Sequence, residues 1–77
     1  MKNIKVYSTA TCPYCKMLKD FLNEKNVSFE NVDVGGNREA AMEMRDKSGQ
    51  MGVPVLDIEG KIIVGFDKEA IIQELGL

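Results

Sequence analysis

Histidine is missing from this 77-residue sequence, and cysteine and proline each occur only twice. Without histidine, one chain can form neither a Cys–His catalytic pair nor a histidine-ligated metal site. The 10 basic and 12 acidic residues are mixed along the chain, which argues against a surface for nucleic-acid phosphates. No apolar run is long enough to cross a membrane, and residues 1–5 show no signal-peptide stretch. We therefore expect one domain, residues 1–77, in the cytoplasm.

The two cysteines stand close together, in the sequence Cys12-Pro13-Tyr14-Cys15. A disulfide across so short a loop restricts the unfolded chain far less than one across a long loop. A stable structural disulfide would also be unusual in the cytoplasm. The spacing therefore favours a reversible two-electron switch over a structural disulfide or two unrelated thiols.

Apolar side chains at three- and four-residue intervals predict helices, and alternating or β-rich runs predict strands. In chain order the predicted elements are a strand at 3–8, a helix from Pro13 to near Asn26, a strand at 27–34, a helix at about 38–48, strands at 54–58 and 61–65, and a helix capped by Asp67. The residues expected to face the core from the helices are Met17, Leu18, Phe21 and Leu22, then Ala41, Met44 and Ser48, and finally Ala70, Ile71 and Leu75.

The order of these elements predicts how they assemble. The first strand–helix–strand unit should be parallel, with a right-handed crossover. The last two strands should form an antiparallel hairpin around Glu59-Gly60, a dipeptide suited to a tight turn. The predicted fold is therefore α/β, in the order β-α-β-α-β-β-α, with a mixed four-stranded sheet and helices on both faces.

Cys12 precedes the first turn of the predicted helix, and this position gives it the role of nucleophile. Unpaired backbone N–H groups and the positive end of the helix dipole favour an anion there, and only a thiolate attacks a disulfide. Cys15 lies one turn deeper, on the hydrophobic face with Leu18. We expect it to be buried, protonated at rest and able to resolve a mixed disulfide formed on Cys12. Pro13 and Tyr14 would set the geometry of the ring and the access to it.

Metal binding and peptide binding without catalysis are the alternatives to a redox function. A zinc site needs four ligands, and two cysteines without histidine supply too few, so we expect no metal site within the chain. A dimer could instead hold an iron–sulfur cluster through Cys12 of each subunit and two external thiols. A peptide-binding adaptor without catalysis would leave the free dithiol unused.

A second signal is Val53-Pro54, shortly before the predicted hairpin. Proline cannot donate to a sheet ladder and belongs at a strand start. If the bond between these residues is cis, Val53 would turn its free backbone N–H and C=O toward the cysteines, where an extended thiol substrate could pair with them. Only about 5–6% of X–Pro bonds are cis, so an ordinary trans proline is the competing interpretation.

A third signal is Gly65-Phe66-Asp67, before the last predicted helix. Gly65 would let a ligand approach the backbone, and N–H groups at the helix start could hold a carboxylate. Asp67 could accept a hydrogen bond from an amine. On these residues alone, a plain strand–turn–helix joint with an aspartate cap is the more frequent arrangement.

Together, these motifs make the sequence resemble a glutaredoxin over nearly its whole length: a short strand, Cys-Pro-Tyr-Cys, Val-Pro before a hairpin, and Gly-Phe-Asp before the last helix. The resemblance implies the thioredoxin fold and reduction of protein disulfides and glutathione mixed disulfides. It also implies no bound cofactor, with glutathione as a candidate co-substrate. By the same resemblance, Pro54 is a cis-proline and Val53 pairs with the substrate. Gly65, Phe66 and Asp67 would bind the γ-glutamyl end of glutathione.

Departures from the usual glutaredoxin pattern make the chain more similar to the small NrdH- and YruB-type redoxins. Thr9 stands at the usual basic residue, and Gly52 at the usual threonine before Val-Pro. Val64 replaces the first of two usual glycines, and Lys68 a usual aspartate. Some of these redoxins take electrons from a thioredoxin-reductase-type flavoprotein. We therefore expect a monomer that acts on a disulfide-containing protein, with glutathione or such a flavoprotein as electron donor.

Overall fold

The computed structural model describes residues 3–50 and 52–76. Its helices and strands follow the predicted order, and most of their bounds lie close to the predicted ones. Within the described residues, no helix is both long enough and apolar enough to span a bilayer. The elements are β1 (Ile4–Ser8), α1 (Pro13–Glu24), β2 (Glu30–Asp33), α2 (Arg38–Ser48), β3 (Val55–Ile58), β4 (Lys61–Val64) and α3 (Lys68–Leu75).

The second strand is the element that differs most from its prediction, because β2 is shorter than the expected 27–34. Asn26 adopts a left-handed backbone conformation, with φ of 59°. Val27 donates its N–H to the carbonyl of Leu22 at 2.9 Å. These residues therefore close the end of α1 instead of starting the strand.

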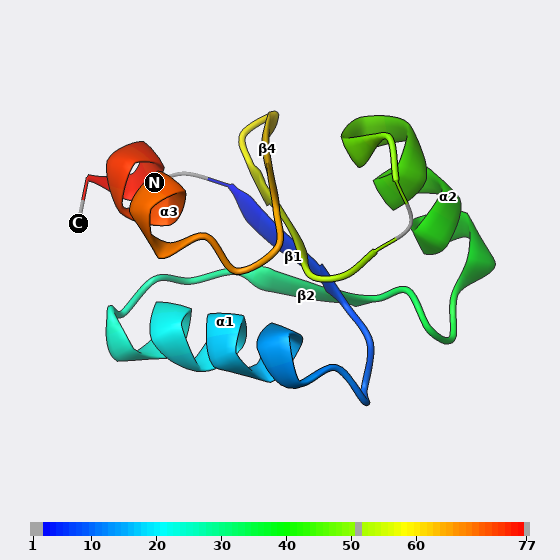
Figure 1. Ribbon diagram of the computed structural model, residues 1–77, viewed down its shortest axis with the longest axis horizontal. Helices are drawn as coiled ribbons and strands as arrows, with labels where there is room; N and C mark the ends of the chain where they lie inside the picture. Colours follow the sequence, from blue (N-terminus) through cyan, green and yellow to red (C-terminus); the bar gives the residue numbers. More distant parts are fainter. Residues whose placement is uncertain (1–2, 51, 77) are drawn as a thin grey trace.

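The strands form one mixed sheet of four, in the order β2-β1-β3-β4 (Figure 1). β1 runs parallel to β2 and antiparallel to β3, and β3 and β4 form an antiparallel hairpin. The predicted parallel unit and hairpin are confirmed. Because Tyr7 near the end of β1 pairs with Val55 at the start of β3, the segment that follows β1 and the segment that precedes β3 meet at the same end of the sheet.

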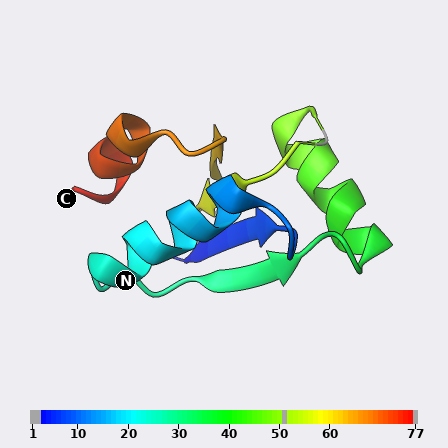
Figure 2. The same cartoon turned by 60° about the horizontal axis from the view of Figure 1, so that its bottom comes forward.

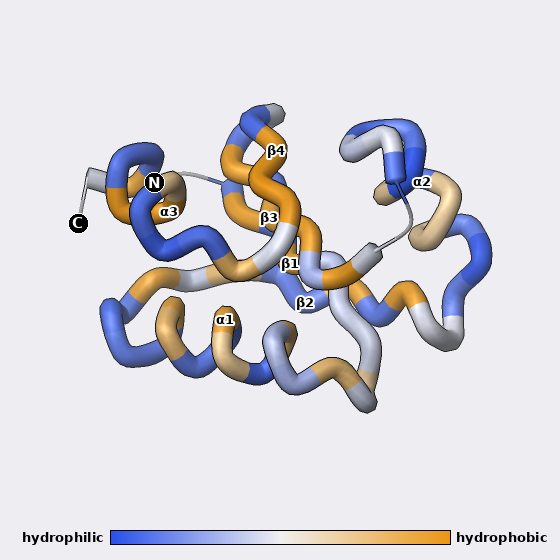
Figure 3. Tube along the Cα trace, viewed as in Figure 1, coloured by the Kyte–Doolittle hydropathy of each residue, from blue (hydrophilic) through white to orange (hydrophobic). Residues whose placement is uncertain are grey.

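Helices cover both faces of the sheet, as predicted. α1 and α3 lie on one face and α2 lies on the other (Figures 1 and 2). Val6 of β1 packs with Leu18 of α1 and Ile71 of α3. Its neighbour Tyr7 points the other way and packs with Met44 of α2, because successive strand residues face opposite sides of a sheet. Hydrophobic residues accordingly concentrate in the central strands and along the helix sides that face them (Figure 3).

One predicted core position on the helices, Met17, is wrong. Met17 is 49% exposed, because Leu18 and Leu22, one turn apart, form the buried side of α1. In α2, Ala40 is buried and the predicted Ala41 only partly so. The other predicted positions on these two helices are buried or partly buried, among them Leu18, Leu22 and Met44.

The hairpin between β3 and β4 turns at Glu59-Gly60, as predicted. Both residues have positive φ, 49° for Glu59 and 96° for Gly60. Positive φ at both central residues matches the turn to the twist of the flanking strands. The carboxylate of Asp57 accepts the backbone N–H of Gly60 at 2.8 Å and holds the turn closed.

Candidate active site

Cys12 lies directly before α1, and Pro13 occupies the first helical position. A proline there loses no helical hydrogen bond, because the first N–H groups of a helix have no intrahelical partner. Cys12 is the N-cap residue, and its Sγ accepts the backbone N–H of Cys15 at 3.1 Å. The side chain is partly exposed. The sulfur is therefore accessible and faces a backbone donor that stabilises negative charge on it.

Cys15 lies on the core side of α1 and is fully buried, and both cysteines are free thiols. Burial raises the pKa of the Cys15 thiol to about 11, and its contact with Cys12 adds to the rise. The two cysteines therefore differ in accessibility as expected from the sequence. Cys12 is partly exposed, whereas Cys15 is buried and protonated at neutral pH.

Val53 and Pro54 lie next to Cys12, and the peptide bond between them is cis. The Val53 carbonyl oxygen is 4.0 Å from Cys12 Sγ. Pro54 is fully buried, and its carbonyl accepts the N–H of Gly65 at 2.8 Å. The start of α1, the segment before β3 and the residue after β4 thus meet at one point.

The predicted ligand-binding residues Gly65, Phe66 and Asp67 make contacts that suffice to build a strand–turn–helix joint. Gly65 has a left-handed φ of 81° and open space around its Cα. Phe66 packs edge-on against Phe21 of α1, with ring centres 5.9 Å apart. Asp67 caps α3 by accepting a backbone N–H of its first turn at 3.2 Å. A role for these residues in binding glutathione stays a prediction.

Two lysine side chains, one on α1 and one on α3, are engaged with other groups. Lys16 points into solvent, where it pairs with Asp20 at 2.9 Å. The ammonium group of Lys68 lies 5.7 Å from the centres of two phenylalanine rings. Tyr14 is 62% exposed and follows Cys12 by two residues. Its bulky ring therefore stands at the open side of the cysteine pair.

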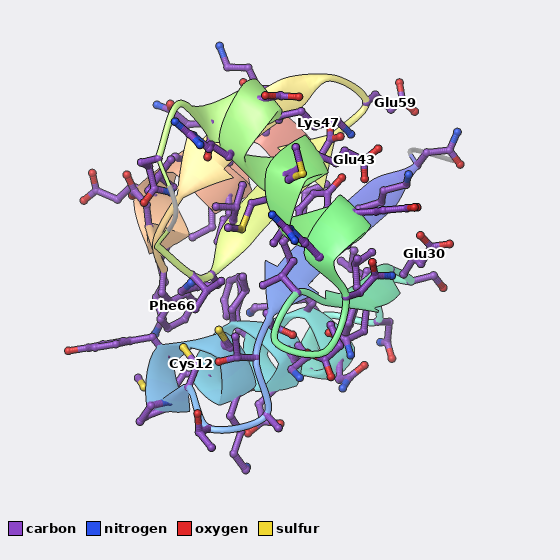
Figure 4. The ribbon with its side chains drawn as sticks, turned by 90° about the vertical axis from the view of Figure 1, so that its right-hand side faces the viewer. Cys12, Glu30, Glu43, Lys47, Glu59 and Phe66 are labelled. Atoms are coloured by element: carbon purple, nitrogen blue, oxygen red, sulfur yellow. The ribbon has the colours of Figure 1, made fainter. Side chains whose placement is uncertain are left out.

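Sequence reasoning missed a polar cluster on the opposite face of the sheet, under α2 (Figure 4). Lys47 donates to Asp57 of β3 at 2.7 Å and to the Tyr7 hydroxyl at 3.0 Å. Lys47 also forms an ion pair with Glu43, one turn earlier in α2, at 3.8 Å. Burial alone would raise the pKa of Asp57, but the hydrogen bonds from Lys47 and Gly60 hold it below its ordinary value. The hydrogen bond to Asp57 likewise raises the pKa of Lys47. The signal available in the sequence was an aspartate inside an apolar strand.

A second missed feature lies in the segment before β3. The side-chain amide of Gln50 bonds to the backbone of Gly52, the residue before Val53. The spacing of these residues gives no sequence signal, because the contact depends on the path of an irregular segment.

Comparisons with known proteins bear on this site. A family model described as Glutaredoxin matches residues 4–63. An uncharacterized glutaredoxin-like 8.6 kDa protein in the rubredoxin operon of Clostridium pasteurianum is 52% identical over 68 residues, which cover 88% of this chain and 91% of the relative. Glutaredoxin 3 of Escherichia coli strain K12 is 39% identical over 67 residues, covering 87% and 81%. Among solved structures, the NrdH-redoxin from Escherichia coli has a TM-score of 0.84 at 25% identity, with 92% of each chain covered.

Proposed function

The chain belongs to the glutaredoxin family, and from this premise we propose that it is a thiol–disulfide oxidoreductase that reduces protein disulfides through Cys12 and Cys15. Its thioredoxin-like fold and its likeness to NrdH-redoxin assign it to the small glutaredoxin-like proteins. The observation that carries the proposal is the pairing of an accessible sulfur with a buried one. Cys12 Sγ faces a backbone N–H at 3.1 Å, and Cys15 is fully buried.

In the first step, the Cys12 thiolate attacks one sulfur of the substrate disulfide. A bond forms between Cys12 Sγ and that sulfur, the substrate S–S bond breaks, and the second sulfur leaves as a thiolate that takes a proton from water. The N–H of Cys15, 3.1 Å from Cys12 Sγ, stabilises the negative charge before the attack. The polar backbone atoms of Val53, beside Cys12, are available to pair with the substrate backbone.

In the second step, Cys15 releases its proton to solvent and attacks Cys12 Sγ. The Cys12–Cys15 disulfide forms, and the remaining substrate sulfur leaves as a thiolate, so the substrate has gained two electrons in all. Because the pKa of Cys15 is raised to about 11, this thiol stays neutral at rest and does not compete with Cys12 for the first attack.

The oxidised protein then regains two electrons from a donor. Two glutathione molecules would supply them by forming glutathione disulfide, and a flavoprotein would supply them from its own dithiol. We favour a thioredoxin-reductase-type flavoprotein, with glutathione as the alternative co-substrate. Support comes from the likeness to NrdH-redoxin, which is described as having a thioredoxin-like activity profile. The departures at Thr9 and Lys68 from the usual glutaredoxin residues point the same way.

Turnover of insulin disulfides with two donor systems tests this function. One system contains NADPH and a thioredoxin reductase, and the other contains glutathione and glutathione reductase. We expect turnover with the first system, and we expect Cys12→Ser to lower the rate to that of the donor alone. Full activity of Cys12→Ser would overturn the proposal. Turnover only with glutathione would keep the oxidoreductase function and reassign the donor.

A further inference from the structure

The segment between α2 and β3, which places Val53 beside Cys12, has no regular secondary structure. Residues 49, 50 and 52–54 belong to no helix or strand. On the C-terminal side of Val53, the carbonyl of Pro54 is held by Gly65. The placement of Val53 therefore also depends on what fixes the residues before it.

The side chain of Gln50 fixes the residue directly before Val53. Its Nε2 donates to the Gly52 carbonyl at 3.0 Å. The Gly52 N–H donates to Gln50 Oε1. A single amide thus occupies both polar backbone groups of Gly52, as a neighbouring strand would.

Gly52 lacks a side chain at the place where the amide of Gln50 lies. A Cβ added to Gly52 would stand 2.6 Å from Gln50 Oε1, closer than real Cβ contacts come. Gly52 is not among the glycines with positive φ, so its backbone conformation does not require glycine. Glycine at this position therefore makes room for the amide.

Gln50 is itself tied to the end of α2. The hydroxyl of Ser48 lies 2.7 Å from the Met44 carbonyl and 2.9 Å from the Gln50 carbonyl, with one proton to donate between them. Met44 is fully buried in the core under α2. A chain of contacts therefore runs from the packed core through Ser48 and Gln50 to Gly52, and Val53 follows as the next residue.

We propose that Gln50 is a positioning residue that determines where the backbone of a peptide substrate pairs beside Cys12. The inference rests on the proposed oxidoreductase function. The polar groups of Gly52 are occupied by Gln50, whereas the N–H of Val53 makes no hydrogen bond to another described residue. An extended substrate therefore pairs with the backbone of Val53. This pairing brings the substrate disulfide close to Cys12, whose Sγ is 4.0 Å from the Val53 carbonyl oxygen.

A comparison of two disulfides in single turnover tests this role. One is a disulfide-linked dimer of a capped cysteine tripeptide, and the other is bis(2-hydroxyethyl) disulfide, which has no peptide group to pair. In each reaction the reduced protein gives up two electrons and forms the Cys12–Cys15 disulfide, and the substrate is released as two thiols. Loss of the hydrogen bonds between Gln50 and Gly52 should weaken peptide binding by about the free energy of one or two hydrogen bonds. We expect Gln50→Ala to lower the second-order rate constant for the peptide about tenfold. The peptide concentration needed for half-saturation should rise, and the rate at saturating peptide should not change. The rate with bis(2-hydroxyethyl) disulfide should not change.

Three further variants separate positioning from general damage. Gly52→Ala should displace the amide and reproduce the loss, and the double variant Gln50→Ala/Gly52→Ala should lose no more than either single variant. Gln50→Glu keeps the acceptor for the Gly52 N–H and loses the donor, so it should lie between wild type and Gln50→Ala. Gln73→Ala, which truncates an exposed glutamine of α3, is the matched control and should behave as wild type.

The outcomes are distinct from those that test the oxidoreductase function. An equal loss on both disulfides, or no loss on the peptide in Gln50→Ala, would overturn the positioning role while the protein remains an oxidoreductase. Additive losses in the double variant would overturn it too. If the wild-type protein reduces neither disulfide, the proposed function fails and this inference fails with it.

Discussion

At the scale of single residues, the roles of the cysteines follow from their difference in burial. The pKa of Cys15 is raised to about 11, with burial as the largest cause. Desolvation by burial does not depend on the charge of Cys12, so we expect it to keep the pKa of Cys15 raised in the mixed disulfide as well. Only the thiolate of Cys15 attacks, so its availability limits the second step.

We predict that decay of the mixed disulfide accelerates about tenfold per pH unit between about pH 7 and 9, because the thiolate fraction rises by that factor below the pKa. Acid quenching followed by mass spectrometry measures the amount of mixed disulfide over time. The control is Cys15→Ser, in which the first attack proceeds and the mixed disulfide persists at each pH. A decay rate of the wild-type protein that does not change with pH would contradict the prediction.

At the scale of elements, Lys47 and Asp57 join α2 to β3 through a hydrogen-bonded ion pair of 2.7 Å. The folded pKa of Asp57 is lowered, so this stabilisation is present above the unfolded aspartate pKa, about 3.9, and is lost as the pH falls through the folded value. The folded pKa of Lys47 is raised, so the stabilisation is present below the unfolded lysine pKa, about 10.4, and is lost only as the pH rises through the folded value.

We predict that Lys47→Met lowers the free energy of unfolding by about 1–3 kcal/mol near neutral pH, because it leaves the mostly buried Asp57 carboxylate without its partner. The difference from wild type should shrink as the pH falls below the unfolded aspartate pKa, about 3.9, and through the lowered pKa of folded Asp57, because the carboxylate then becomes protonated. Urea unfolding at several pH values measures both effects.

The matched control is Lys16→Met, which breaks the exposed pair with Asp20. Its effect should stay below about 0.5 kcal/mol at any pH, because exposed pairs contribute little. Equal losses in Lys16→Met and Lys47→Met would show that the cluster under α2 contributes no more than a surface pair.

The elements also show how far the sequence could predict this fold. Both bounds of α2 were predicted because local signals mark them. Asn37 caps the start of the helix, and Gly49, with φ of 76°, closes its end. Strand alternation and the Glu59-Gly60 turn predicted the hairpin in the same local way. What failed was the placement of Met17 in the core, because Met17 and Leu18 are both hydrophobic and only packing against the sheet chooses between them.

The same distinction between local signals and tertiary packing applies to the candidate site and to the polar cluster under α2. Cys12 at a helix start and Cys15 one turn further in could be predicted because both positions are set by local helix geometry. The contacts of Lys47 with Asp57 and of Gln50 with Gly52 could not. They depend on how α2 lies across the sheet and on the path of the irregular segment after it, and sequence periodicity fixes neither.

At the scale of the whole molecule, the surface argues against self-association. Within residues 3–50 and 52–76, the exposed large hydrophobic residues are spread over four different elements. Both edge strands of the sheet are short, and β2 carries Glu30, Asn31 and Asp33 along its exposed edge. Charged residues on an edge strand disfavour pairing with a second copy. In the described part of the chain, these exposed large hydrophobic residues are Tyr14 and Met17 on α1, Met42 on α2, Val64 on β4 and Ile72 on α3.

We therefore predict that the reduced protein sediments as a monomer of 8.6 kDa, and that it stays a colourless monomer after anaerobic incubation with ferrous iron, sulfide and glutathione. A cluster-bridged dimer would need Cys12 of two copies to approach each other. Tyr14, 62% exposed at the open side of the cysteine pair, would have to move or be buried for that approach. Sedimentation velocity with absorbance detection measures size and colour together. A coloured dimer that is lost in Cys12→Ser would contradict the prediction and make this chain a cluster carrier, whereas colour that persists in Cys12→Ser would come from iron bound elsewhere.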